Sequence, residues 1–500
     1  MTSTSTAARR ARPHARPAWV VLSLACACQF MVILDAAIVN VALPSIRREL
    51  GFTPTALPWV VNGYLLTFAG FMLLGGRAAD LFGHRRMLAA GLFLFSGSSL
   101  AGGLATVPEV LVAARVAQGM GAAMLAPATL AVLTTTFAGE RVRARAFGAW
   151  SAAGGVGGMA GAVAGGAITT GLSWRWVFLI NVPIGAVLMA VAMMSLAGTR
   201  TGGRQSLDLV GAVTGTAGLA ALIYGVMQSA GHGWASAQVL GPAGTGLLLL
   251  VVFTVVEARF ATQPMLPLRL FRTRRVAVGN VLLLLFGAIA IAMWYFTSLF
   301  LQNVLGFTAL RAGLGQTPAA VTFVVVARWA AALLPRTGVR PLVLAGCGGF
   351  LAGFSWLAQA HTHSSYAGSV LGPTLLIAVG IGLTFPTLMA AATADAPEGD
   401  AGTIGGLAST SSQVGGSVGL AALATAASAR AAAGGSSPAT ALAAGYDLVF
   451  LMAAGISLAI AVVSVLLPQA RAAARPEPTA PTTTLGTAAR ESGTGPGTAR

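Results

Sequence analysis

The chain has 500 residues, of which 56% are hydrophobic and only 9% charged, and its mean hydropathy is +0.80. An average soluble domain carries roughly 25% charged residues. This composition therefore excludes a set of soluble domains and indicates that most of the surface faces lipid. The 30 basic residues against 13 acidic ones do not indicate a nucleic-acid partner, because they are arginines in short clusters between apolar runs, as in membrane topology signals.

The amino end predicts a retained first membrane helix. Residues 1–18 form a basic tail with four arginines, and an apolar run follows over residues 19–43. This run is too long for the roughly 7–15 residues of a signal-peptide core.

Apolar runs of about 20 residues, enough to cross a bilayer core of about 30 Å, recur along the whole chain. Their expected ranges are 19–43, 58–76, 87–106, 108–134, 147–170, 176–196, 208–229, 237–257, 276–301, 311–334, 341–360, 368–392, 402–428 and 447–468.

These runs predict an all-α membrane protein with about fourteen transmembrane helices. We expect a six-helix bundle over 19–196, two linker helices over 197–258, a second six-helix bundle over 259–468 and a disordered tail over 469–500. A weak repeat supports two related bundles, since Gly83-His84-Arg85 and Gly338-Val339-Arg340 occupy matching places in them.

The arginines predict the orientation. Both tails and the loops on their side hold 23 arginines, whereas the opposite side holds 5. Because positive charge collects on the cytoplasmic side, we expect both termini in the cytoplasm and the chain in the inner membrane.

Charges inside the membrane are costly and usually functional. Asp35 is the acid placed well inside a predicted span, while Glu109, Asp208, Glu257 and Asp447 fall at span ends. At 1.5 Å per residue, Asp35 and Arg115 lie roughly 6 Å and 9 Å outward of their span centres. They are thus expected at similar depth, either as a structural salt bridge or as a carboxylate that an arginine helps to load and release a proton.

The run over 147–170 carries small residues at helical spacing. Gly157, Gly161 and Gly165 form one row; Gly154, Gly158, Ala162 and Gly166 form another. Such rows let a facing helix approach closely, which serves either packing or the rocking of two bundles.

Several motifs in order carry a family resemblance. They are Leu34 to Pro44 (LDAAIVNVALP), Gly76 to Arg86 (GRAADLFGHRR), the set Arg115, Gln118, Gly119 and Gly121, the glycine rows, and Ser173 to Gly185 (SWRWVFLINVPIG). LDLVGA and Ser298 to Leu314 also fit. Together they resemble the major facilitator superfamily, in its fourteen-helix drug:proton antiporter branch.

The resemblance implies a set of functional residues. Asp35 and Arg115 would couple transport to protons, the glycine rows would form the antiporter motif, and a cytoplasmic loop would latch one conformation through Gly76, Asp80, Gly83, Arg85 and Arg86. We also expect seven residues to contact substrate in a central cavity, although each of them could instead be a packing residue. They are Asn62, Tyr64, Trp294, Tyr295, Gln302, Gln316 and Gln413.

The sequence therefore predicts a monomeric antiporter that exports small, hydrophobic drugs or antibiotics, driven by the proton motive force without a cofactor or metal. Without lysine the chain cannot form a GxxxxGK[ST] nucleotide loop, and we find no enzyme constellation. A proton symporter that imports a metabolite, and a membrane sensor or scaffold without flux, remain alternatives.

Overall fold

A computed structural model describes residues 18–137, 140–196, 208–260, 264, 268–393, 401–434 and 437–467. All regular structure in these ranges is helical, as the sequence predicts. The predicted tail over 469–500, and nearly all of the predicted tail over 1–18, lie outside the described residues.

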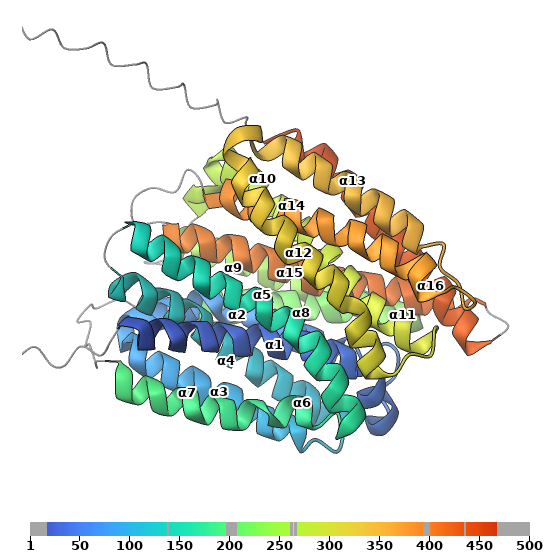
Figure 1. The fold of residues 1–500 in the computed structure, drawn as a ribbon, viewed down its shortest axis with the longest axis horizontal. Coiled ribbons are helices and arrows are strands. Elements are labelled where there is room, and N and C mark those ends of the chain that lie inside the picture. Colours follow the sequence, from blue (N-terminus) through green and yellow to red (C-terminus); the bar gives the residue numbers. More distant parts are fainter. Residues whose placement is uncertain are drawn as a thin grey trace, which may run out of the picture.

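The amino-terminal half forms one bundle of helices that run side by side (Figure 1). α1 packs along α5, α2 packs along α4, and α3 packs against α4 and α7. The helices are α1 (Ala18–Leu50), α2 (Trp59–Phe82), α3 (His84–Gly103), α4 (Pro108–Thr136), α5 (Glu140–Gly171), α6 (Trp176–Leu179) and α7 (Asn181–Ser195).

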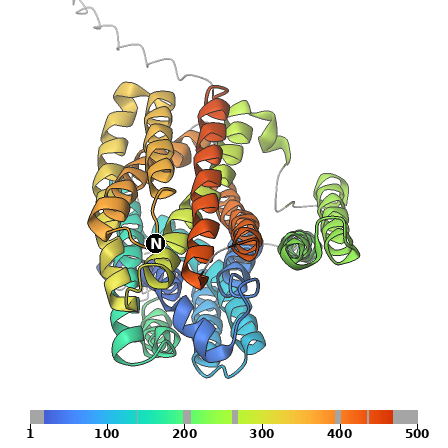
Figure 2. The same ribbon diagram turned by 90° about the vertical axis from the view of Figure 1, so that its right-hand side faces the viewer.

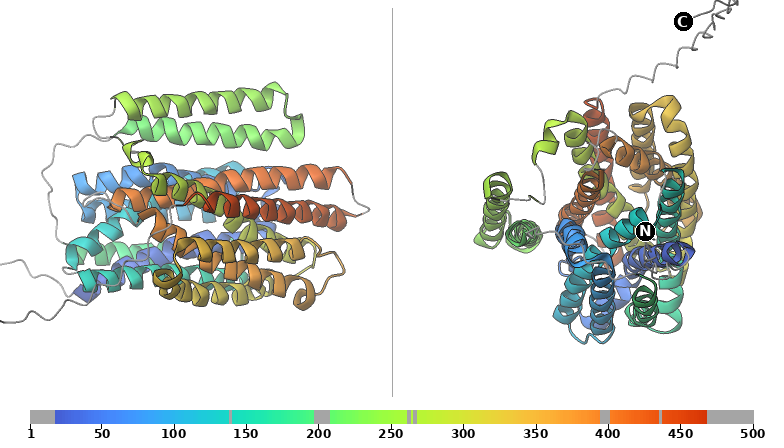
Figure 3. Two further views of the ribbon diagram at one scale, coloured as in Figure 1. Left: turned by 90° about the horizontal axis from the view of Figure 1, so that it is seen from above. Right: turned by 90° about the vertical axis from the view of Figure 1, so that its left-hand side faces the viewer.

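Two linker helices form a hairpin at the side of the molecule (Figure 2). α8 (Leu209–His232) packs along α9 (Ala237–Val255), which continues into a π-helical turn, η1 (Val256–Phe260). Of this pair, α8 also contacts α2 and α15, so the hairpin touches both bundles. The same arrangement is visible along the top of the left view in Figure 3.

The carboxyl-terminal half forms the second bundle. α10 packs against α15, α12 and α13 pack against α14, and α16 packs against α13 and α15. Its elements are η2 (Leu268–Arg272), α10 (Arg274–Ile291), η3 (Ala292–Phe296), α11 (Thr297–Asn303), α12 (Ala309–Thr337), α13 (Val339–Leu357), η4 (Ala367–Leu371), α14 (Gly372–Thr393), α15 (Ala401–Ala432) and α16 (Pro438–Ser464).

Ten helices among the described residues are long and apolar enough to cross a membrane. The remaining predicted spans fall on α2, α3, α8 and α15, which are also helical. α15, for example, is rich in glycine, serine and threonine, which lower its hydropathy without breaking the helix. The chain is thus a multi-pass membrane protein, with helices at all of the predicted spans.

Two differences from the predicted spans concern polar residues. In the run 176–196 the helical hydrogen bonding is interrupted at Ile180, between α6 and α7, although Ile180 keeps helical backbone angles. Pro183 explains the interruption, because it has no N–H to donate to the carbonyl of Leu179.

The last span begins earlier than expected, at Pro438, where the Ser437 side chain caps the helix. Asp447 therefore lies well inside α16 and not at a span end, so the expectation that placed it at an end was wrong.

The repeated glycine positions have the same backbone role in both bundles. Gly83 joins α2 to α3 with φ 88°, and Gly338 joins α12 to α13 with φ 78°. A positive φ favours glycine because it has no Cβ. Each pair of helices is thus joined by a single residue.

Candidate functional site

An ion pair lies inside the amino-terminal bundle. Asp35 of α1 is 0% exposed and Arg115 of α4 is 1% exposed. The Arg115 Nη1 donates to Asp35 Oδ2 over 2.6 Å. The structure thus brings together the two charges that the sequence places at similar depth.

Two amide side chains complete the surroundings of Asp35. Its Oδ1 accepts from Gln118 Nε2 of α4 and from Asn181 Nδ2 of α7, each over 2.7 Å. Gln118 and Asn181 also donate to the hydroxyl oxygen of Ser99 on α3, over 2.7 and 3.4 Å. Every described bond to Asp35 comes from an N–H donor, so the set matches an ionised carboxylate.

The guanidinium of Arg115 is held on several sides. Its Nε donates to the Val60 carbonyl over 2.8 Å, and its Nη1 also donates to Gln118 Oε1 over 2.7 Å. Its Cζ lies 4.3 Å from the centroid of the Tyr64 ring and 5.9 Å from that of Phe178. These contacts fix the cation by planar hydrogen bonding and by stacking, both of which suit arginine more than lysine.

A second cluster at the end of α1 anchors the segment that supplies Asn181. Glu49 accepts from Trp174 Nε1 over 2.6 Å and pairs with Arg175 Nη2 over 3.0 Å. The Arg175 guanidinium lies 4.5 Å from the Trp174 ring centroid. The motif SWRWVFLINVPIG therefore contacts α1 at Glu49 and again at Asp35.

The surroundings of Asp35 stabilise a negative charge on its carboxylate. An ionised carboxylate away from water is stable only if it is paired and hydrogen-bonded, and Asp35 has one cation and two amides for this purpose. Addition of a proton neutralises Asp35 and leaves a single cation, so the charge of the bundle interior changes by one.

The glycine rows of α5 face two different helices. A Cβ on Gly157, Gly161 or Gly165 would lie 2.7 to 2.8 Å from a backbone oxygen of α1, whereas Gly154 and Gly158 would meet only side chains of α1, at 3.2 and 3.6 Å. Gly166 faces α12, where a Cβ would lie 2.6 Å from the Ala309 carbonyl oxygen. α5 thus packs closely against its own bundle and against the other one.

The bundles touch at the end of the molecule where α1 and α5 finish. Gln302 of α11 donates to the Val41 carbonyl over 3.0 Å, and Ser298 donates to the Asn40 carbonyl over 3.3 Å. The Leu310 amide of α12 donates to Thr170 Oγ1 of α5 over 3.2 Å. Gln302, a predicted substrate contact, therefore joins the two bundles in this state.

The predicted latch lies at the α2–α3 connection. Gly76 faces Pro127 of α4, where a Cβ would lie 3.5 Å from the proline Cβ. At the start of α3, Arg85 is half-buried and Arg86 is exposed. The Asp80 side chain lies outside the described part of the chain, so the latch stays a prediction.

The other predicted substrate contacts are not gathered in one place. Asn62 is buried next to Met227 of α8, 4.0 Å from its sulfur, and Tyr64 stacks on Arg115. Tyr295 is buried within the second bundle against Phe296. Gln316 is buried, and its Nε2 has no hydrogen-bond partner among the described residues, while Trp294 and Gln413 are half-buried. Contact of these residues with substrate stays a prediction.

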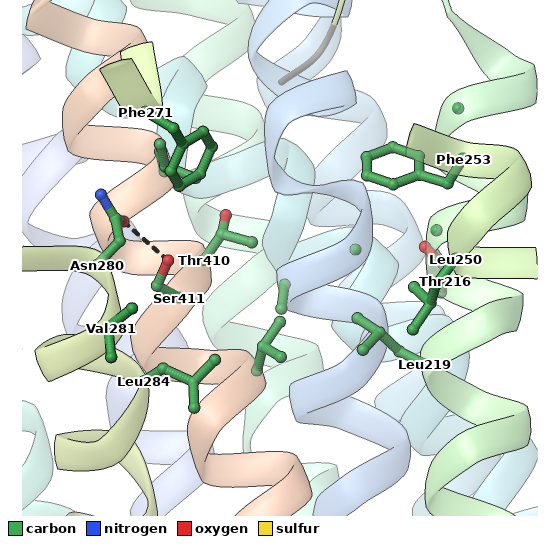
Figure 4. A pocket seen from close by; sticks show the side chains of 16 residues that line it. Thr216, Leu219, Leu250, Phe253, Phe271, Asn280, Val281, Leu284, Thr410 and Ser411 are labelled. Carbon is green, nitrogen blue, oxygen red and sulfur yellow. Dashed lines mark hydrogen bonds between the residues drawn. The ribbon is translucent and has the colours of Figure 1, made fainter. Parts of the chain in front are cut away.

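A cavity of about 300 Å³ lies where the linker hairpin meets both bundles (Figure 4). Its walls come from α2, α8, α9, η2, α10 and α15 and are mostly apolar. At one side, Ser411 donates to Asn280 Oδ1 over 2.8 Å. None of the substrate contacts predicted from the sequence lines this cavity.

Sequence reasoning missed the uncharged partners of Asp35. Gln118 was named beside Arg115 in one motif and Asn181 lay within another, but no bond of either to Asp35 was predicted, and Ser99 was not named. The sequence did contain a signal for these partners, because they are polar residues inside apolar runs at a depth similar to that of Asp35.

Known proteins resemble this chain over most of its length. The family model described as Major Facilitator Superfamily matches residues 25–420. The cephamycin export protein CmcT of Amycolatopsis lactamdurans is 45% identical over 90% of this chain and 93% of its own. The puromycin resistance protein pur8 of Streptomyces alboniger is 36% identical over 92% and 93%.

Solved structures share the fold at low identity. A crystal structure of the nucleoside transporter NupG gives a TM-score of 0.63 at 13% identity and covers 90% of this chain and 99% of its own. An inward-facing, occupied bacterial homologue of the human lysosomal transporter Spinster gives 0.62 at 16%, over 89% and 96%. With two helical bundles, a buried ion pair between α1 and α4, and these matches over most of its length, the chain belongs to the Major Facilitator Superfamily.

Proposed function

We propose that this chain is a proton-driven antiporter that exports a small, hydrophobic drug or antibiotic across the cytoplasmic membrane. The observation that carries the proposal is the buried Asp35, held by Arg115, Gln118 and Asn181. Asp35 would take up a proton from outside and release it to the cytoplasm. Arg115 would stabilise the ionised form between these steps.

Two further observations support drug export. Relatives of this length include proteins named for cephamycin export and for puromycin resistance. The cavity beside α2 offers mostly apolar walls with a few hydrogen-bonding groups, as do many sites for small hydrophobic ligands.

The arginine distribution supports cytoplasmic termini in an inner-membrane protein. With that orientation the end where α1 contacts α11 and α5 contacts α12 is the outer face. The structure then represents a state closed to the outside. We propose that the transporter works as a monomer without a cofactor, since one chain supplies both bundles, and that it is not an enzyme.

The test is a comparison of transport in a host that lacks its main efflux systems. Cells with and without the gene are challenged with cephamycin, puromycin and a panel of other antibiotics. Transport of each protective compound is then measured in membrane vesicles with an imposed pH gradient. We expect resistance to at least one compound and uptake into inverted vesicles that stops when the gradient is dissipated.

Asp35→Asn provides the control for coupling. Asn keeps the shape of the side chain but cannot carry a proton, so active export should be lost while the protein still inserts and folds. Gradient-driven export by Asp35→Asn at the wild-type rate would refute the assignment of Asp35. Uptake from the medium driven by protons would favour a symporter, and no flux of any compound would favour a sensor or scaffold.

A further inference from the structure

The partners of Asp35 suit one protonation state only. Arg115, Gln118 and Asn181 all present N–H groups to its two oxygens. A protonated carboxyl has an O–H that must donate a hydrogen bond, and a buried donor without an acceptor is costly. The site therefore needs an acceptor that is absent from the present set of bonds to Asp35.

The acceptors nearby are mostly occupied. Gln118 Oε1 accepts from Arg115, and the Ser99 oxygen accepts from Gln118 and Asn181. By contrast, Asn181 Oδ1 is buried and has no hydrogen-bond partner among the described residues. Asn181 itself is 0% exposed, so bulk water does not serve this oxygen.

We propose that Asn181 is an amide switch that adapts the site to the protonation state of Asp35. When Asp35 is ionised, Asn181 Nδ2 donates to it, as in this structure. When Asp35 gains a proton, the amide turns by half a rotation and its Oδ1 accepts from the new O–H. The proton stays on Asp35 and Asn181 keeps both amide hydrogens, so Asn181 is a positioning residue. The proposal rests on the proposed function of Asp35 as proton carrier.

The local structure permits such a rotation. Asn181 is the first residue of α7, and the segment that precedes it contacts α1 through Trp174 and Arg175 on Glu49. Rotation about the last side-chain bond of asparagine is soft and nearly two-fold. The rotation ends the two bonds that Nδ2 makes to Asp35 and Ser99 and replaces them with two bonds accepted by Oδ1, one from the protonated Asp35 and one from the Ser99 hydroxyl, whose oxygen still accepts from Gln118.

Few other charged groups lie near Asp35 in the described structure. Arg115 of α4 pairs with Asp35, and Tyr64 of α2 lies against the other side of Arg115. α3 and α7 present Ser99 and Asn181, α5 presents glycines, and α11 reaches α1 through the uncharged Ser298 and Gln302. A change in the Asn181 amide signal during a pH titration can therefore be assigned to protonation of Asp35, because no second acid is described beside it.

The first test is infrared difference spectroscopy of the full-length protein in lipid nanodiscs during a pH titration. The chain has five asparagines, so amide-labelled asparagine gives a small set of bands, and Asn181→Thr assigns the Asn181 band. We expect the carboxyl band of protonated Asp35 and a shift of the Asn181 band to rise with the same pH midpoint. Both changes should be absent in Asp35→Asn.

A matched pair of variants gives a second, independent test. Gln118→Leu removes a donor to ionised Asp35 and should raise the pH midpoint of proton uptake on the order of one unit. Asn181→Leu removes a partner from both protonation states, so its midpoint should move by less than half as much. Asn181→Thr keeps a donor and an acceptor and should preserve the wild-type midpoint.

Two results would overturn the switch. One is an Asn181 band that does not change while Asp35 titrates, and the other is an upward shift in Asn181→Leu as large as that in Gln118→Leu. Neither result affects the proposed function, which fails instead if no Asp35 band titrates and Asp35→Asn still exports.

Discussion

At the scale of single residues, the contacts of Arg115 give a prediction about pH dependence. Replacement of Arg115 by a neutral residue removes the cation beside Asp35, and this loss favours the protonated form of the Asp35 carboxyl. Proton release at neutral pH then becomes limiting. We expect Arg115→Gln to lower gradient-driven export at neutral pH at least about tenfold and to move the pH optimum upward, because without the cation Asp35 keeps its proton at a pH where the wild type releases it. The measurement is the pH–rate profile of export in vesicles, corrected for protein content.

Arg115→Lys is the matched variant for that experiment. It keeps the charge, but a lysine cannot reproduce the planar set of bonds to Asp35, Gln118 and the Val60 carbonyl. Its rate and optimum should lie between those of the wild type and Arg115→Gln. If well-expressed Arg115→Gln retained the wild-type pH profile, the ion pair would have only a structural role.

The sequence predicted the pairing of the charged members of this site but not the contacts of the neutral ones. Asp35 and Arg115 stand out because a charged residue inside an apolar run is costly unless it is paired or functional. Their similar depths in the membrane, calculated from their positions along two helices, were enough to predict that they pair. Asn181 and Asn62 are both polar residues in apolar runs, yet one bonds to Asp35 and the other faces Met227 of α8. Which face of a helix meets which neighbour depends on packing, and residue type and depth do not specify it.

At the scale of helices, the close approach of α5 to α1 predicts opposite outcomes for neighbouring glycines. A Cβ on Gly157 would lie 2.7 Å from the Phe30 carbonyl oxygen, whereas one on Gly158 would lie 3.6 Å from the nearest atom, of Ile33. Overpacking costs about 1–3 kcal/mol, while alanine improves on glycine in a helix by about 1 kcal/mol. Gly157→Ala should therefore lower the melting temperature of the purified protein, and Gly158→Ala should leave it unchanged or raise it.

This pair also separates packing from helix propensity. If both variants melted together with the wild type, the two helices would be less closely packed than the structure has them. Equal destabilisation by both would indicate that glycine is needed for flexibility of α5 and not for contact with α1.

Helix boundaries followed from the sequence where local chemistry dominates. The single-glycine connections at Gly83 and Gly338 and the general positions of the spans were predictable from turn residues and apolar runs. The interruption at Ile180 was not expected, because the run 176–196 is apolar apart from Asn181 and Ser195, and because Pro183 near its start is also compatible with an ordinary first helical turn. The early start of α16 was hidden by alanines, which favour a helix but carry little hydropathy signal.

At the scale of the whole molecule, alternating access requires that the bundle contacts at one end break and re-form. In this structure the last part of α5 and the start of α12 are in contact through glycines, and in the proposed orientation these are the outer ends of the two helices. A Cβ on Gly166 would lie 2.6 Å from the Ala309 carbonyl oxygen, and one on Gly313 would lie 2.1 Å from the Ala162 carbonyl oxygen. Because these are backbone atoms of opposite bundles, added volume has to separate the bundles and not merely turn a side chain.

Gly166→Ala should thus disfavour the closed outer face and increase the population with separated outer ends. Spin labels at Leu172 and Arg311, both exposed near this contact, would report the change by pulsed electron resonance, in a background with Cys26, Cys28 and Cys347 replaced by alanine. We expect the distance distribution to gain a longer component in Gly166→Ala and to stay as in the wild type in Gly171→Ala, where a Cβ meets nothing within 4 Å.

A longer component in both variants would point to a general loosening of α5. An unchanged distribution in Gly166→Ala would mean that this contact does not hold the outer face closed, and the gate would then have to depend on the hydrogen bonds of Ser298 and Gln302 to α1.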